Sequence, residues 1–214
     1  MVDTVWLIRH GMRLNFENLA WMKTAARPHD SPLSETGLQQ SRETAYFLQD
    51  KGIRHLFASP FTRTLQTAGI IAEALRLPLN VEYGFYEWLN PAWTPAFPEI
   101  LTPAEACAEF PMIDPAYRSY SGPGYPEADE NVHVYNRVKP ALTGIVRDYD
   151  GPVAIVGHGA SMHQAARTLV DPPEGFLREM CAINKLERHG SRWRIVFSST
   201  AHLSELGHQP TRFR

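Results

Sequence analysis

The sequence predicts an α/β fold, a three-layer sandwich in which helices flank a mostly parallel sheet. Two observations carry this prediction. Short apolar runs rich in β-branched residues alternate with helix-length segments over residues 5–82, and such runs are typical of strands buried on both faces. Two of the runs, at 5–8 and 153–156, are followed by a histidine beside glycine, as expected where neighbouring strands end at one edge of a parallel sheet.

The first part of the chain has clear start and stop signals. Ser34 is a suitable N-cap for the first long helix, and Gly52 is a suitable stop. Residues 12–33 are polar and contain Pro28 and Pro32, so we expect a loop there. The expected elements are a strand at 5–8, a helix at about 36–51, a strand at 55–58, a helix at 61–75 and a strand at 79–82.

The composition then changes. Residues 91–126 hold 8 of the 17 prolines, together with several aromatic residues, and this segment is too aromatic for a disordered linker. We expect an insertion, about residues 84–128, packed on the edge of the sheet with a short helix near 103–110.

The last part of the chain returns to regular elements within what we expect to be a single domain, residues 1–214. His189, Gly190 and Ser191 form a hairpin signal between two strands. We expect the tail after Leu206 to be frayed. The expected elements are a helix at 129–149, a strand at 153–156, a helix at 161–170 and strands at 181–187 and 193–197.

Composition and charge exclude several classes of protein. The net charge of −2 and pI near 6.5 argue against a nucleic-acid-binding surface, and no run of 18 apolar residues could span a membrane. Cys107 and Cys181 fit neither a disulfide framework nor a zinc site, and the N-terminus does not resemble a signal peptide. We therefore expect reduced thiols and a cytoplasmic protein.

Candidate site residues follow the predicted strand ends. His10 and His158 are expected to face one crevice, and Arg63 lies in the first turn of a helix beside it, where a cation suggests an anionic partner. Arg9 and Arg13 flank His10. The excess of arginine over lysine reflects either coding bias or the binding of an oxyanion, because the guanidinium fork suits phosphate.

These residue types favour phosphoryl transfer without a metal. A neutral imidazole is a good nucleophile toward phosphorus, and guanidinium groups stabilise the transferring phosphoryl group. His158 and His163 are not accompanied by a carboxylate cluster, and the chain has no HExxH motif. We expect neither a metal nor a cofactor.

Four segments, in order, resemble the histidine phosphatase (phosphoglycerate mutase-like) superfamily, and the resemblance covers residues 5–200. It is greatest to the branch of the ecdysteroid-phosphate phosphatases and the suppressor of T-cell receptor signalling phosphatases, because of Arg13, of DSPL at 30–33, and of FYEWL at 85–89 after Val81-Glu82. The four segments read LIRHG at 7–11, SPLSETG at 31–37, SPFTRTLQTA at 59–68 and VGH at 156–158.

The resemblance implies a role for each matched residue. His10 would be the phosphorylated nucleophile, and Glu87 the acid that protonates the leaving oxygen and then the base that activates water. Glu82 is the rival acid. Tyr86 and Trp88 beside Glu87 predict a pKa raised by desolvation. Met12 stands where many members have glutamate. The implied phosphate-binding residues are Arg9, Arg13, Arg63 and His158.

The resemblance favours an acid-type phosphatase acting on a small-molecule or peptidyl phosphomonoester. A phosphoglycerate-mutase-type phosphotransferase and a catalytically silent phospho-ligand binding module stay open as alternatives. A homodimer through the apolar edge near the hairpin also stays open. The aromatic residues either rim the crevice, which would suit a bulky or aromatic substrate, or pack the insertion's own small core; they are Trp21, Phe85, Trp88, Trp93 and Phe97.

Overall fold

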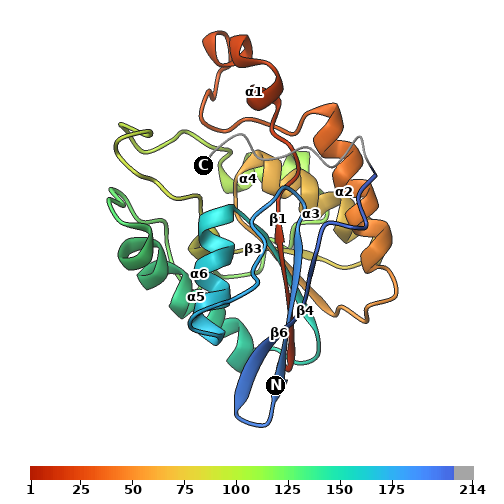
Figure 1. Ribbon diagram of the computed structural model, residues 1–214. Helices are drawn as coiled ribbons and strands as arrows, with labels where there is room; N and C mark the ends of the chain where they lie inside the picture. Colours follow the sequence, from red (N-terminus) through yellow and green to blue (C-terminus); the bar gives the residue numbers. More distant parts are fainter. Residues whose placement is uncertain (205–214) are drawn as a thin grey trace.

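One six-stranded sheet forms the centre of the molecule in the computed structural model, which describes residues 1–204 (Figure 1). The strand order is β3-β2-β4-β1-β5-β6. The first four of these strands run parallel, and β5 and β6 are antiparallel to their neighbours. The strands are β1 (Thr4–Arg9), β2 (His55–Ala58), β3 (Leu79–Val81), β4 (Val153–Gly157), β5 (Ile183–His189) and β6 (Arg192–Ser199).

Helices cover both faces of this sheet and confirm the predicted three-layer sandwich. Helices α2 and α3 lie on one face, and α5 and α6 lie on the other (Figure 1). The α-helices are α1 (Leu14–Glu17), α2 (Glu35–Leu48), α3 (Thr62–Leu75), α4 (Pro103–Glu109), α5 (Tyr135–Asp148) and α6 (Gly159–Leu169). Three shorter helical segments are η1 (Leu19–Lys23), η2 (Tyr83–Phe85) and η3 (Glu130–Val134).

The central strand β1 shows how the sequence builds two cores. Its side chains alternate, as in any strand, so Trp6 and Ile8 pack with α2 and α3 while Val5 and Leu7 pack with α5 and α6. All four side chains are buried. A strand that is apolar on both faces must lie inside a sandwich, and this places the end of β1 at the centre of the molecule.

The insertion packs on the edge of the sheet, as predicted. Ile113 forms a parallel bridge with Leu79 of the edge strand β3, and Leu101 and Ala106 join the core beside α3. The short helix predicted near 103–110 is α4, and Thr102 caps it in a capping box with Glu105. The insertion is therefore fixed to the sheet at several points.

The structure corrects some predicted boundaries. Residues 12–33 are not all loop, because they contain α1 and η1. Helix α2 ends at Leu48 rather than near 51. Cys181 has a φ of 52°, which interrupts extended backbone, so β5 begins at Ile183 and not at 181. The tail after Leu206 lies outside the described residues. Within residues 1–204, none of the helices has the length and apolar character needed to cross a membrane.

Candidate active site

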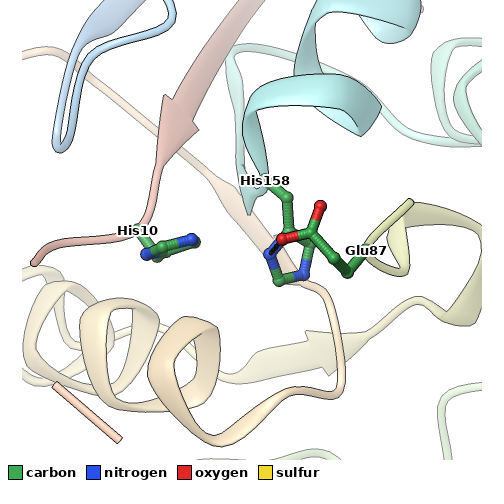
Figure 2. A group of neighbouring side chains, drawn as sticks. All are labelled: His10, Glu87 and His158. Carbon is green, nitrogen blue, oxygen red and sulfur yellow. Dashed lines mark ion pairs between the residues drawn. The ribbon is translucent and has the colours of Figure 1, made fainter. Parts of the chain in front are cut away.

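The ends of β1 and β4 bring His10 and His158 together (Figure 2). His10 directly follows β1 and His158 directly follows β4, and these two strands are parallel neighbours. The centroids of the two imidazole rings lie 5.2 Å apart, and both side chains are buried. The structure thus places both strand-end histidines in one site, as the sequence predicts.

His10 is held as a neutral imidazole. Its Nδ1 lies 2.7 Å from the carbonyl oxygen of Gly11. Because a carbonyl oxygen can only accept, Nδ1 is the protonated nitrogen and donates a hydrogen bond to that oxygen. Nε2 keeps its lone pair, and Nε of Arg63 donates to it at 3.4 Å. Burial, followed by the charges of Arg63 and His158, holds the pKa of His10 well below its usual value. A neutral ring with an unprotonated Nε2 is the form that a nucleophile needs.

Glycine is required directly after His10, because another backbone segment passes very close to position 11. A Cβ atom added to Gly11 would lie 2.5 Å from the carbonyl oxygen of Gly37, and one added to Gly37 would lie 2.1 Å from the carbonyl oxygen of Met12. Two backbone segments therefore touch where only glycine fits. This contact fixes the turn after β1 against the start of α2, and with it the carbonyl that orients His10.

His158 has a partner on each ring nitrogen. The hydroxyl of Ser59 lies 2.7 Å from Nε2, and Oε2 of Glu87 lies 3.2 Å from Nδ1. A neutral ring satisfies both contacts when Nδ1 donates to the carboxylate and Nε2 accepts from the serine. Burial lowers the pKa of His158 to about 4, although the carboxylate of Glu87 acts in the opposite direction.

Arg63 lies in the first turn of α3 and links the other side chains of the site. Its side chain is 1% exposed. Nη2 lies 3.2 Å from Oε2 of Glu87 and 3.3 Å from Nδ1 of His158. The guanidinium also stacks over the ring of Phe61, 4.4 Å from its centroid. The cation at this helix start therefore lies beside both histidines, where the sequence places it.

Arg9 and Arg13, which flank His10 in the chain, lie close enough to Arg63 and Glu87 for their charges to interact. Arg9 donates to the carbonyl oxygen of Arg178, and Nε of Arg13 donates to Asn15 at 3.0 Å. Burial, together with the charge of Arg63, lowers the pKa of Arg9 to about 10 and that of Arg13 to about 9. These three guanidinium groups repel one another, so an anion bound between them would be stabilised.

Glu87 lies in the loop after η2 and points to His158 (Figure 2). Its side chain is 27% exposed. Burial raises the pKa of Glu87, but the contact with His158 and the charge of Arg63 outweigh burial and hold this pKa well below its usual range. The predicted raised pKa is therefore wrong, because the hydrogen bond from His158 and the charge of Arg63 decide the shift and the apolar side chains of Tyr86 and Trp88 do not.

Glu82, the rival acid, has a structural role. Its buried carboxylate accepts from the hydroxyl of Tyr117 at 2.6 Å, from the hydroxyl of Ser119 at 2.5 Å and from the backbone N–H of Tyr120 at 2.9 Å. It also accepts from the backbone N–H of Gly84 at 2.8 Å. Glu82 fastens the insertion to the end of β3, and Glu87 is the carboxylate that contacts His158.

Among the described residues, one group of side chains has ligand atoms close enough together to hold a metal ion. The group is His10, Glu87 and His158, whose ligand atoms lie within 4.8 Å of one another. The charges around them oppose this use. Arg63 lies within hydrogen-bond distance of all three side chains, and the positive groups of Arg9 and Arg13 are nearby. A divalent cation would enter a positive environment there, whereas an oxyanion would find hydrogen-bond donors.

Sequence reasoning missed several residues that support the site. Ser59 and Asp30 belong to the quoted motifs, but their contacts with His158 and with the first turn of α3 were not foreseen. Arg137 and Glu127, which hold the loop of Glu87, carry no local sequence signal. A buried arginine and glutamate show their pairing only in three dimensions.

A neutral histidine among guanidinium groups, at the carboxyl edge of a parallel sheet, defines a protein that handles an oxyanion such as a phosphoryl group. Residues 5–200 match the histidine phosphatase superfamily (branch 1), and the chain belongs to this superfamily. The family predicted from the sequence is thereby confirmed.

Curated relatives carry different names. The probable phosphoglycerate mutase GpmB of Yersinia pestis is 29% identical over 199 residues, which cover 88% of this chain and 86% of the relative. The human ubiquitin-associated and SH3 domain-containing protein A is 28% identical over 211 residues, covering 79% of this chain. The transcription factor tau 55 kDa subunit of Saccharomyces cerevisiae is 36% identical over 107 residues, covering 46% of this chain. The matches span only 31% and 23% of these last two relatives.

Solved structures share the fold. The ecdysone phosphate phosphatase from Bombix mori, solved with tungstate, superposes with a TM-score of 0.75 at 22% identity, covering 99% of this chain and 98% of the other. A mycobacterial glucosyl-3-phosphoglycerate phosphatase superposes with a TM-score of 0.64 at 21% identity, covering 91% and 98%.

Proposed function

We propose that this chain is an acid-type phosphomonoester hydrolase that works through a phosphohistidine on His10, without a metal or cofactor. The observation that most supports this function is the neutral ring of His10, whose Nε2 faces Arg63. Among the described residues, Nη1 of Arg63 and Nε of Arg9 are buried donors with no hydrogen-bond partner. Unpaired guanidinium donors beside a neutral nucleophile support the binding of phosphoryl oxygens.

In the first half-reaction, Nε2 of His10 attacks phosphorus and the bond from phosphorus to the leaving oxygen breaks. Glu87 gives its proton to that oxygen, so an alcohol leaves. Arg9, Arg13 and Arg63 stabilise the charge on the phosphoryl oxygens, and once Glu87 is protonated the Nδ1–H of His158 is free to donate to one of them. Glu87 is ionised beside Arg63, but a bound phosphate dianion would compete for these cations and repel the carboxylate. Substrate binding would thereby raise the pKa of Glu87 and load it with the proton.

In the second half-reaction, water attacks the phosphohistidine. The carboxylate of Glu87 takes a proton from that water, the bond from Nε2 to phosphorus breaks, and inorganic phosphate leaves. The ring of His10 returns to its neutral state, with its Nδ1 proton still donated to the carbonyl oxygen of Gly11. One residue acts as acid and then as base, so no other proton carrier is required.

A bulky or aromatic leaving group is the substrate class that we favour. Trp88 and Trp93 pack 4.9 Å apart, and Phe97 lies 5.5 Å from Tyr86 and 6.2 Å from Tyr125, measured between ring centroids. Trp93 is 64% exposed and Phe97 is 46% exposed, so these two rings lie at the surface, whereas Phe85 and Tyr86 are buried. The half-buried Trp88 follows Glu87 in the chain and packs against the exposed Trp93, which supports a rim that receives the leaving group.

This substrate class can be tested with two alkyl phosphates that have similar leaving oxygens, benzyl phosphate and ethyl phosphate. We expect a higher kcat/KM for benzyl phosphate, and the ratio should fall in Trp93→Ala and Phe97→Ala. Tyr46→Ala, which removes an exposed ring far from the site, is the matched control. An unchanged ratio in both rim variants would leave the aromatic preference without support.

A mutase is the second candidate function, because a relative named as a probable phosphoglycerate mutase matches 88% of this chain. A mutase must keep its phosphohistidine from water and pass the group to a second acceptor. A silent binding module has less support, since a module that only binds would not need the neutral, oriented ring of His10.

The first experiment measures hydrolysis of p-nitrophenyl phosphate between pH 5 and 8 with excess EDTA. We expect activity in the natural chain and in His189→Ala, which changes an exposed histidine of the hairpin, and none in folded His10→Ala. Loss of activity in EDTA would overturn the metal-free mechanism. An inactive natural chain would contradict the hydrolase, and transfer between phosphoglycerates would then distinguish the mutase from the module.

We further propose a cytoplasmic location and no disulfide, because Cys107 and Cys181 are both free. We also propose that the exposed edge strand β6 is the surface by which two copies would pair. Sedimentation of the purified protein over a range of concentrations would test that pairing.

A further inference from the structure

A buried ion pair lies behind the loop that carries Glu87. Arg137 of α5 and Glu127 at the end of the insertion are 6% and 1% exposed. Nε of Arg137 donates to Oε1 of Glu127 at 2.7 Å, and Nη2 donates to Oε2 at 3.0 Å. The pairing is bidentate, which fixes the plane of both groups.

The remaining donors of Arg137 all go to the backbone of the Glu87 loop. Nη1 donates to the carbonyl oxygens of Gly84 at 2.8 Å and Tyr86 at 3.0 Å, and Nη2 donates to that of Glu87 at 3.2 Å. A guanidinium has five N–H donors, so every donor of Arg137 has an acceptor here. No lysine could make this set of contacts, because an ammonium group has three donors and no planar fork.

Glu127 holds the same loop from its other end. Its Oε2 accepts from the backbone N–H of Leu89 at 3.0 Å, and its carbonyl oxygen accepts from Nε1 of Trp88 at 2.7 Å. The backbone N–H of Glu127 also donates to the carbonyl oxygen of Leu89 at 3.0 Å. The loop is therefore held on both sides of Glu87, while the Glu87 carboxylate itself extends to His158 and Arg63.

We infer that the Arg137–Glu127 pair is a positioning device for the proton transfer made by Glu87. The inference rests on the proposed function, in which Glu87 protonates the leaving oxygen. Neither residue makes a hydrogen bond with the histidines or the arginines of the site, so the pair acts through the backbone of the loop. Proton transfer requires heavy atoms within hydrogen-bond reach, so a small displacement of this loop lowers the rate of protonation.

The test uses two phosphomonoesters that need the acid to different degrees. A p-nitrophenolate leaves without a proton, whereas the alkoxide of benzyl phosphate requires one. We expect Glu87→Gln to lower kcat/KM for benzyl phosphate about 10²–10⁴-fold and to affect p-nitrophenyl phosphate far less. Arg137→Lys should reproduce this selectivity, with a loss at least about tenfold greater for benzyl phosphate. Glu127→Gln should show the same selectivity in milder form.

Three controls separate positioning from a merely structural role. Leu142→Ala removes a buried side chain of the same helix and should lower Tm without changing the ratio of the two kcat/KM values. Inhibition by inorganic phosphate should be unchanged in Arg137→Lys, because the phosphate-binding residues are not altered. In the double variant with Glu87→Gln, Arg137→Lys should cause no further selective loss.

The outcomes distinguish the two proposals. If Glu87→Gln shows no leaving-group selectivity, or His10→Ala stays active, the proposed function fails. If Glu87→Gln is selective while folded Arg137→Lys and Glu127→Gln lower both substrates equally, the positioning inference is overturned. Should Arg137→Lys not fold, Glu127→Gln decides alone, since it keeps the size of the side chain and the acceptor for Leu89.

Discussion

Asp30 lies in the segment between η1 and α2, and its carboxylate accepts two hydrogen bonds from Thr62 in the first turn of α3. Its Oδ1 accepts from the backbone N–H of Thr62 at 2.8 Å, and its Oδ2 accepts from the hydroxyl of Thr62 at 2.6 Å. Phe61, the N-cap residue of α3, makes no side-chain cap of its own. A carboxylate from elsewhere in the chain therefore caps this helix and ties the loop of Arg13 to the helix of Arg63.

Replacing Asp30 with alanine should loosen this tie. We expect a loss of about 0.5–2 kcal/mol of unfolding free energy, the usual cost of a lost helix cap. Inorganic phosphate should inhibit less strongly, because Arg13 and Arg63 would no longer be held together. Urea denaturation and the inhibition constant for phosphate measure these effects.

Asp30→Asn is the matched variant, since its amide oxygen can still accept from the N–H of Thr62. It removes the charge that lies 3.9 Å from Nη1 of Arg63, so phosphate should inhibit at least as strongly as in the natural chain. Equal inhibition constants in the alanine and asparagine variants would contradict the capping argument.

In Ser59→Ala, His158 would lose the hydrogen bond that orients its ring on the Nε2 side. The 2.7 Å contact is buried, and its loss leaves Nε2 without a donor, at a cost of about 1–3 kcal/mol. We expect lower stability and a lower kcat/KM for p-nitrophenyl phosphate. Ser198→Ala, which removes a hydroxyl bonded to Asn184 on the hairpin strands, should leave the rate unchanged. A full rate in Ser59→Ala would show that Glu87 alone orients the ring.

The sequence predicts the histidines and arginines of the site because their positions follow from local rules. A parallel sheet collects its strand ends at one edge, and this brings His10 and His158 together although they are far apart in the chain. Gly11 and Gly37, at which two backbone segments touch, could also be found from the sequence, because both lie in the quoted motifs.

The ionisation of Glu87 could not be predicted in the same way. Its sequence neighbours are aromatic, but the charged or titratable groups that its carboxylate contacts are His158 and Arg63, which lie at the end of β4 and in α3. The Arg137–Glu127 pair was also invisible, because the sequence does not show which charged residues become buried together. Charge and burial are three-dimensional properties, so a pKa inferred from sequence neighbours alone was wrong.

The two site histidines should make the protein sensitive to acid. Burial lowers the pKa of His158 to about 4, and the pKa of His10 also lies well below its usual value. The usual pKa of histidine is 6.5, and that of folded His158 is about 4. At pH values between these two, the unfolded chain binds a proton at this histidine that the folded chain does not bind. Stability is therefore full above pH 6.5 and falls as the pH falls, by about 1.4 kcal/mol per pH unit for each such histidine.

Urea denaturation at several pH values between 7 and 4.5 measures this slope. His158→Asn should reduce it by the share of one histidine, while His189→Asn, at an exposed position, should not. A slope that is the same in all three proteins would mean that His158 is protonated in the folded state and pairs with Glu87 as an ion pair.

Two glycine-to-alanine substitutions should have opposite effects on stability. In Gly37→Ala the new Cβ would meet the carbonyl oxygen of Met12 at 2.1 Å, so backbone must move. We expect a large loss of stability, of the order of 3 kcal/mol or more, because overpacking against backbone cannot be relieved by a side-chain rotation. The displaced turn carries the carbonyl of Gly11, so the orientation of His10 and the hydrolysis rate should suffer as well.

In Gly69→Ala, inside α3, the new Cβ would meet only Cδ1 of Phe110 at 3.7 Å, an ordinary contact. Alanine is the better helix former by about 0.8–1 kcal/mol, so this variant should be more stable than the natural chain and equally active. Thermal unfolding of the two variants compares them directly. If Gly37→Ala were as stable as Gly69→Ala, the turn after β1 would be free to move, and a fixed backbone carbonyl could not be what orients His10.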